Sequence, residues 1–145
     1  MTEVAEEIYT EWAHNHHFTL YDDVPDALRA LHGRGVRLGL ISNSHRCLES
    51  FQTHFEIEGL ISVTVSSIEH NVMKPNPRIF TTALELMRVR AADAVMVGDS
   101  LAQDVAGARR VGMRGILLAR GGGDVPADPD VAVIRSLAEL PDLLA

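Results

Sequence analysis

Short apolar runs rich in β-branched residues alternate along this chain with segments of helical spacing, and this alternation restricts the possible folds most strongly. Strands are predicted over residues 36–41, 63–65, 94–97, 115–118 and 131–134. Helices are predicted over 24–31, 47–54, 102–111 and 137–144, and another begins at Pro77. Strands that alternate with helices pair in parallel through right-handed crossovers. The predicted fold is therefore α/β, with a doubly wound, Rossmann-like parallel sheet in three layers.

The composition is that of one ordinary globular domain. The chain has 145 residues, of which 46% are hydrophobic and 23% are charged. A chain of this length can bury roughly two-thirds of its unfolded surface. Thirteen lysine and arginine residues against twenty aspartate and glutamate residues give a formal net charge of −7. This sign disfavours a nucleic acid or an anionic membrane as the partner.

The cysteine count and the start of the chain predict a cellular location. The single cysteine, Cys47, cannot form an internal disulfide. Residues 1–12 lack a basic region followed by an apolar segment, which a secretory signal would have. No run reaches the roughly twenty apolar residues of a membrane helix. We therefore expect a soluble, cytoplasmic protein.

Polar residues follow two of the predicted strands and precede one of the helices. Ser42 and Asn43 come directly after the first strand, and Asp99 and Asp104 follow the strand at 94–97. Lys74 lies just before the helix that begins at Pro77. In doubly wound sheets, ligands bind beyond the carboxyl ends of the strands. These side chains are therefore predicted to share one site.

The residue types suit phosphate chemistry. A lysine and a hydroxyl supply the positive charge and the donors that phosphoryl oxygens need. Carboxylates at a strand end suit a hard cation such as Mg²⁺. Taken singly, Ser42 and Asn43 are typical of a turn or helix cap, Asp99 of a capped turn, and Lys74 of a solvated surface charge. Their occurrence together favours the site.

Ser42, Lys74 and the Asp99/Asp104 pair, in this order, resemble the motifs of the haloacid dehalogenase-like hydrolase superfamily, whose members are mostly phosphatases. The likeness extends from about Val24 to the C-terminus. It implies that Ser42 and Lys74 bind phosphate and that Asp99 belongs to an acidic metal site. Asp104 would orient Lys74 or the metal shell.

The family's first motif, a strand that ends in Asp-x-Asp and supplies the nucleophile, has no counterpart in the predicted strands. The expectation is an N-terminally truncated member, with residues 1–23 as a residual cap helix and linker and residues 24–145 as the core. In the family the missing strand is central, between the strand ending at Ser42 and the strand ending at Asp99.

The missing strand has a structural consequence. Its loss would expose two apolar sheet edges, and such edges pair, are covered or aggregate. Val4, Ile8 and Trp12 also form one apolar stripe at helical spacing, a second candidate interface. A homo-oligomer assembled through the edges and this N-terminal helix is predicted.

Without the nucleophile, hydrolysis would need a metal-activated water. Glu11 and His14 form a Glu-x-x-His pair, and His16 and His17 follow closely. With Asp99, these side chains could hold Mg²⁺, Mn²⁺ or Zn²⁺. The competing interpretation is a polar helix end with solvated histidines.

The predicted function is metal-dependent hydrolysis of a small phosphate monoester or diester. Ser42, Asn43, Lys74, Asp99 and Asp104 are the candidate catalytic residues, and the first three also bind substrate. Two alternatives stay open: an inactive family remnant that acts as an assembly module, and a half-enzyme that another chain completes.

Overall fold

The computed structural model describes residues 21–43, 52, 57, 59–121, 128 and 130–144. Its strands are β1 (Gly39–Ser42), β2 (Val63–Ser66), β3 (Val95–Gly98), β4 (Arg114–Leu118) and β5 (Ala132–Ile134). Its helices are α2 (Asp23–Gly33), α4 (Ser67–His70), α5 (Pro77–Met87), α6 (Ala106–Arg110) and α7 (Leu140–Leu143). Short 3₁₀ turns occupy η1 (Ala91–Asp93) and η3 (Leu137–Glu139), and η2 (Leu101–Val105) is a π-helical segment. The predicted alternation of strands and helices is confirmed for these residues. The helix predicted over 47–54, apart from residue 52, and the stripe of Val4, Ile8 and Trp12 lie outside them.

Local sequence signals explain most of the element boundaries. Asn76 accepts a hydrogen bond from the backbone N–H of Arg78, and Pro77 occupies the first turn of α5, where its missing N–H costs nothing. The first strand begins three residues later than predicted, at Gly39, where pairing with β2 starts. Helix α4 was not predicted, although Ser66 and Glu69 have the spacing of a capping box.

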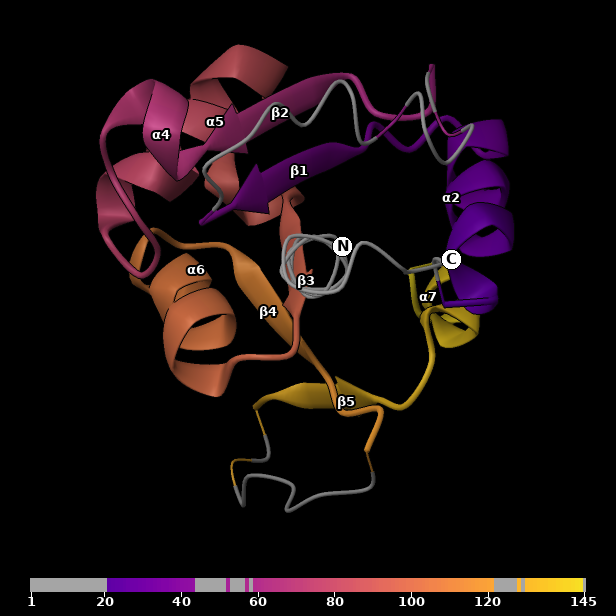
Figure 1. The fold of residues 1–145 in the computed structure, drawn as a ribbon. Helices are drawn as coiled ribbons and strands as arrows, with labels where there is room; N and C mark the ends of the chain where they lie inside the picture. Colours follow the sequence, from indigo (N-terminus) through magenta and orange to yellow (C-terminus); the bar gives the residue numbers. More distant parts are fainter. Residues whose placement is uncertain are drawn as a thin grey trace, which may run out of the picture.

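The strands form two parallel sheets that do not pair with each other in the described part of the chain (Figure 1). One sheet contains β1 and β2, and the other has the order β3-β4-β5. Two cores of buried apolar side chains bridge both sheets. One joins α2 and α7 to β1, β3 and β4, and the other joins α5 and α6 to β1, β2 and β3. The sheets are thus two halves of the middle layer of a three-layer fold, as the Rossmann-like prediction requires.

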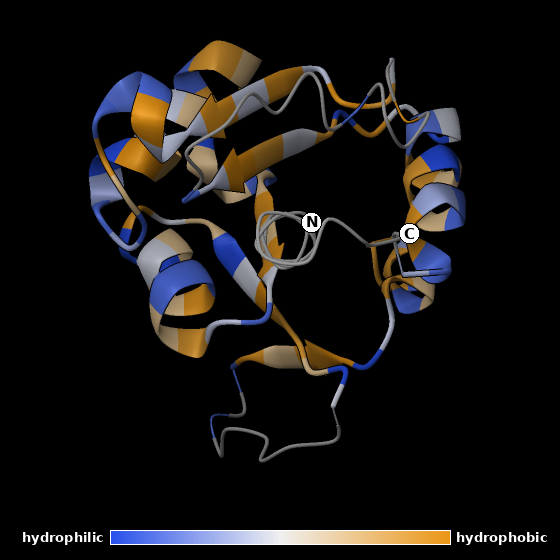
Figure 2. Ribbon diagram, in the orientation of Figure 1, coloured by the Kyte–Doolittle hydropathy of each residue, from blue (hydrophilic) through white to orange (hydrophobic). Residues whose placement is uncertain are grey.

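Helix α2 shows how one helix covers this layer. Its buried side chains, Val24, Ala27, Leu28 and Leu31, recur at helical spacing, and its other residues are mostly polar. Figure 2 shows the same division, with apolar colour on the helix side toward the sheets. None of the described helices has both the length and the hydrophobicity that a membrane span requires.

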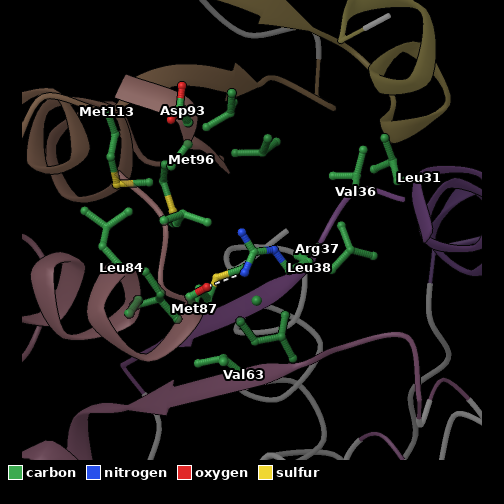
Figure 3. Close-up of a pocket in the computed structure, with 18 of the residues that line it drawn as sticks. Leu31, Val36, Arg37, Leu38, Val63, Leu84, Met87, Asp93, Met96 and Met113 are labelled. Carbon is green, nitrogen blue, oxygen red and sulfur yellow. Dashed lines mark hydrogen bonds between the residues drawn. The ribbon is translucent and has the colours of Figure 1, made fainter. Parts of the chain in front are cut away.

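A cavity of about 670 Å³, here called the slot, separates the two sheets (Figure 3). It is lined by β1 and β3 and by the side chains of the flanking helices. This is the place at which the sequence predicts a missing central strand. Assembly into a homo-oligomer through these edges remains a prediction.

A network around Asp23 ties the start of α2 to the end of the chain. The Asp23 carboxylate accepts two hydrogen bonds from Arg120, both 3.0 Å long. It also accepts bonds from Ser136 Oγ at 2.7 Å and from the Leu137 N–H at 2.8 Å. The Arg120 guanidinium lies 4.0 Å from the centroid of the Tyr21 ring. The network joins segments that lie more than 90 residues apart in the sequence.

We expect Asp23→Asn to lower the free energy of unfolding at pH 7 by about 1.5–3 kcal/mol, because charge-assisted hydrogen bonds are lost. Burial raises the pKa of Asp23, but the hydrogen bonds from Arg120, Ser136 and Leu137 outweigh burial, so this pKa lies below its ordinary value. A carboxylate whose pKa is lowered in the folded state stabilises the fold at pH values above its unfolded pKa of about 3.9. This stabilisation is lost as the pH falls through the lower, folded-state pKa. Urea denaturation from pH 7 to pH 2 should therefore show less acid sensitivity in the variant than in the wild type. Equal acid sensitivity in both would contradict this account.

Candidate active site

Lys74 and Asp104 form a fully buried ion pair. Lys74 Nζ lies 2.7 Å from Asp104 Oδ1, and both side chains have no solvent exposure. Removing two charges from water costs several kcal/mol per ion, which the attraction offsets only in good geometry. The sequence left two roles open for Asp104, and the structure brings it into contact with Lys74. The two charges are therefore held in one geometry inside the protein, unlike those of an ion pair on its surface.

Asn43 links the end of β1 to the backbone of Lys74. Its Oδ1 accepts a hydrogen bond from the Lys74 N–H at 2.8 Å, and its Nδ2 donates to the Lys74 carbonyl oxygen at 3.4 Å. Both polar atoms of the Asn43 amide therefore hydrogen-bond to the backbone of Lys74. Asn43, predicted as a catalytic and substrate-binding residue, fixes the position of the lysine in this arrangement.

Asp104 is held from the other side by the segment that follows β3. Its Oδ2 accepts a hydrogen bond from the Ser100 N–H at 3.2 Å, and Ser100 Oγ caps the start of η2 by accepting from the Gln103 N–H. Gly115 in β4 allows η2 to approach, since a Cβ there would lie 3.1 Å from Val105 Cα. No role was predicted for Ser100, although a serine three residues before a helical N–H is a capping signal.

These contacts place the carboxyl ends of β1 and β3 at the same edge of the molecule. Asn43, directly after β1, hydrogen-bonds to the backbone of Lys74, and the Lys74 ammonium pairs with Asp104. Asp104 in turn accepts a hydrogen bond from the Ser100 N–H, just beyond β3. These hydrogen bonds thus join three of the five candidate catalytic residues, Asn43, Lys74 and Asp104, together with Ser100. Ser42, the last residue of β1, directly precedes Asn43. Asp99 directly follows β3, next to Ser100, and is exposed.

The hydroxyl of Ser42 is buried at the end of β1. The residue is the last of β1 and has no solvent exposure, and its Oγ has no hydrogen-bond partner among the described residues. Buried polar groups are normally hydrogen-bonded, and an orphan costs roughly 1–3 kcal/mol. A ligand oxygen that accepts from this hydroxyl would remove that cost.

The metal ligands predicted from the sequence are only partly within the described residues. Glu11, His14, His16 and His17 lie outside them. Within the described part of the chain, no group of three or more histidine, cysteine, aspartate or glutamate side chains could hold a metal ion. Both oxygens of Asp104 already accept hydrogen bonds, and a Mg²⁺ site needs several oxygen ligands. The described residues therefore do not form a metal site by themselves.

The fold and the strand-end site place the chain among the Rossmann-like α/β proteins. Within that class, residues 2–112 match the family described as "Hydrolase: haloacid dehalogenase-like hydrolase". The chain belongs to this family, as its motifs predict.

Relatives and solved structures agree with this assignment. The chain is 33% identical to "Haloacid dehalogenase-like hydrolase domain-containing protein 3" of Bos taurus over 88% of its own length and 50% of the relative's. It is 35% identical to "Glyceraldehyde 3-phosphate phosphatase" of Pyrococcus abyssi (strain GE5 / Orsay), over 70% and 44% of the two lengths. The structure of a "HAD phosphatase from Thermococcus onnurineus" superposes with a TM-score of 0.84 at 31% identity, over 97% of this chain and 64% of the other. The chain thus spans about half the length of the curated relatives it matches.

Proposed function

We propose that this site binds the phosphoryl group of a small phosphate monoester or diester and supports its hydrolysis. The observation that carries the proposal is the buried Lys74–Asp104 pair beside β1, whose last residue, Ser42, has a buried hydroxyl with no hydrogen-bond partner in the described part of the chain. A transferring phosphoryl group requires fixed positive charge and hydrogen-bond donors around its oxygens. Lys74, held in place by a carboxylate, and the Ser42 hydroxyl supply these two features. The phosphatase named among the relatives supports the same reaction class.

Each residue has a distinct part in this proposal. Lys74 supplies fixed positive charge, and Asp104 and Asn43 position it. Ser42 donates its hydroxyl hydrogen to a phosphoryl oxygen. Asp99, exposed at the end of β3, is the carboxylate that can act on the attacking water or contribute to cation binding.

The assay uses p-nitrophenyl phosphate and bis-p-nitrophenyl phosphate with metal-stripped protein, before and after addition of Mg²⁺, Mn²⁺ or Zn²⁺. The Asp99→Asn variant is the activity control. Hydrolysis that falls at least tenfold in this variant supports the proposal. No hydrolysis of either ester with any of these metals, in a folded sample, would overturn it for this chain.

Ser42→Ala separates stability from function. Because the buried hydroxyl has no described partner, we expect the free energy of unfolding of the variant to equal or exceed that of the wild type. Its hydrolysis rate, or its affinity for inorganic phosphate by calorimetry, should fall at least tenfold, since a charge-assisted donor to the phosphoryl group is lost.

Ser66→Ala is the matched control for this variant. Ser66 also ends a strand, β2, with no solvent exposure, but its Oγ accepts a hydrogen bond from the Glu69 N–H. Its loss should cost about 1 kcal/mol of stability through the missing helix cap and leave phosphate binding intact. The assignment of Ser42 fails if the two variants behave alike.

A further inference from the structure

Three large apolar side chains are exposed on the segments that carry the candidate phosphate site. Ile68 is 57% exposed, Met73 58% and Leu101 43%, and we call these three the apolar rim. They are half of the six large apolar side chains exposed in the described part of the chain. Single exposed apolar residues are ordinary, whereas a group of them beside a polar site marks a surface that a ligand covers.

The end of β2 places Ile68 near Ser42. Ser66, the last residue of β2, pairs in register with Ser42, the last residue of β1. Ile68 lies two residues beyond Ser66, in the helix α4 that Ser66 caps. Figure 1 shows α4 directly beyond the arrowhead of β2. Ile68 therefore belongs to the same edge of the molecule as the buried hydroxyl of Ser42.

The buried ion pair places the other two members of the apolar rim. Met73 directly precedes Lys74, whose Nζ lies 2.7 Å from Asp104 Oδ1. Leu101 directly follows Ser100, whose N–H donates to the other oxygen of Asp104. The ion pair and this hydrogen bond thus hold the two segments together at the point where the phosphoryl group is proposed to bind.

The charges of these segments restrict the ligand group that the apolar rim can accept. Residues 67–73 and 99–103 contain the carboxylates of Glu69 and Asp99 and no lysine or arginine, and their only basic side chain is His70. The ammonium of Lys74 is paired with Asp104. A second phosphate or a carboxylate on the substrate would meet negative charge here with little to balance it. An uncharged group is therefore favoured.

We propose that the apolar rim binds the alcohol part of the substrate, so that the site selects phosphate esters of apolar, uncharged alcohols over those of short or anionic alcohols. This inference rests on the proposed function, because a phosphoryl group held at Lys74 and Ser42 fixes one end of the substrate. The alcohol part then covers the apolar rim, and the removal of apolar surface from water raises the affinity.

The test is calorimetry with the full chain and two phosphonates, whose P–C bond resists hydrolysis, under the conditions of the hydrolysis assay. Hexylphosphonate and ethylphosphonate share a head group and differ by four methylene groups, each worth up to roughly fourfold in affinity when removed from water. We expect hexylphosphonate to bind at least about tenfold more tightly than ethylphosphonate. It should also bind at least about tenfold more tightly than 6-phosphonohexanoate, which ends in a carboxylate. Equal affinities of hexylphosphonate and ethylphosphonate, or no binding of either, would overturn the proposal.

Met73→Gln and Leu101→Gln test whether the apolar rim causes this preference. Each should lower the ratio of hexylphosphonate to ethylphosphonate affinity at least about threefold. Leu86→Gln is the matched control, because Leu86 is 52% exposed but adjoins Met87, whose carbonyl oxygen accepts a hydrogen bond from Arg37 ahead of β1, at the opposite edge of the sheet. Its ratio should equal that of the wild type. A ratio that falls equally in all three variants, or in none, would contradict the assignment.

Selectivity and hydrolysis can fail separately. If p-nitrophenyl phosphate is not hydrolysed but the affinity ratios follow these expectations, the hydrolytic activity fails and the apolar rim stands. If it is hydrolysed and the two phosphonates bind equally, the apolar rim fails and the hydrolytic activity stands.

Discussion

Lys74→Met is expected to lower the free energy of unfolding by about 3–5 kcal/mol, because it leaves the Asp104 carboxylate buried without its counter-charge. The side chains are 2.7 Å apart and fully buried, so water cannot take the place of the lysine without opening the structure. Urea denaturation at pH 7 measures the effect.

The double variant Lys74→Met/Asp104→Leu is the control. Replacing both charges by apolar groups of similar volume is often neutral or stabilising. The double variant should therefore recover most of the loss, apart from the cost of the Ser100 N–H that no longer has the Asp104 oxygen. It should have no phosphate-binding activity. A single variant that loses less than about 1 kcal/mol would show that the pair is solvated, as ion pairs on a protein surface are.

Phe80→Ala is the second change with a large expected effect, a loss of about 3–5 kcal/mol from a buried aromatic side chain. Phe80 of α5 has no solvent exposure, and its ring lies against Gly107 of α6. A Cβ on Gly107 would lie 2.6 Å from the Phe80 ring and 3.3 Å from Pro75 Cβ. The ring therefore fills the space that a glycine leaves between two helices and the segment beside Lys74.

Gly107→Ala provides the matched test of this packing. Alone it should destabilise the protein by about 1–3 kcal/mol through overpacking. Combined with Phe80→Ala, the added methyl group enters the cavity, so the double variant should be at least about 0.5 kcal/mol more stable than additivity predicts. Additive effects in urea denaturation would show that the ring and the glycine do not share this space.

The sequence alone determined the class of fold and the residues that gather at the strand ends. Apolar runs such as 63–65 and 115–118 alternate with amphipathic segments such as α2, and this local pattern requires burial on both faces of a parallel sheet. The same pattern places Ser42 and Asp99 after strands. The resemblance to the haloacid dehalogenase-like family, whose Asp-x-Asp strand has no counterpart here, also implied where the middle layer is interrupted, and the two described sheets separate at that place.

Only the tertiary structure decided how these residues interact. The sequence cannot show that Lys74 is buried, that Asn43 uses both ends of its amide on the lysine backbone, or that Ser42 lacks a described partner. The bond between Arg120 and Asp23 spans 97 residues and has no local signal. Periodicity reports which face of an element is buried, whereas hydrogen-bond partners depend on how elements distant in sequence pack together. For that reason the strand-end residues were predictable, and the geometry of the site and the slot were not.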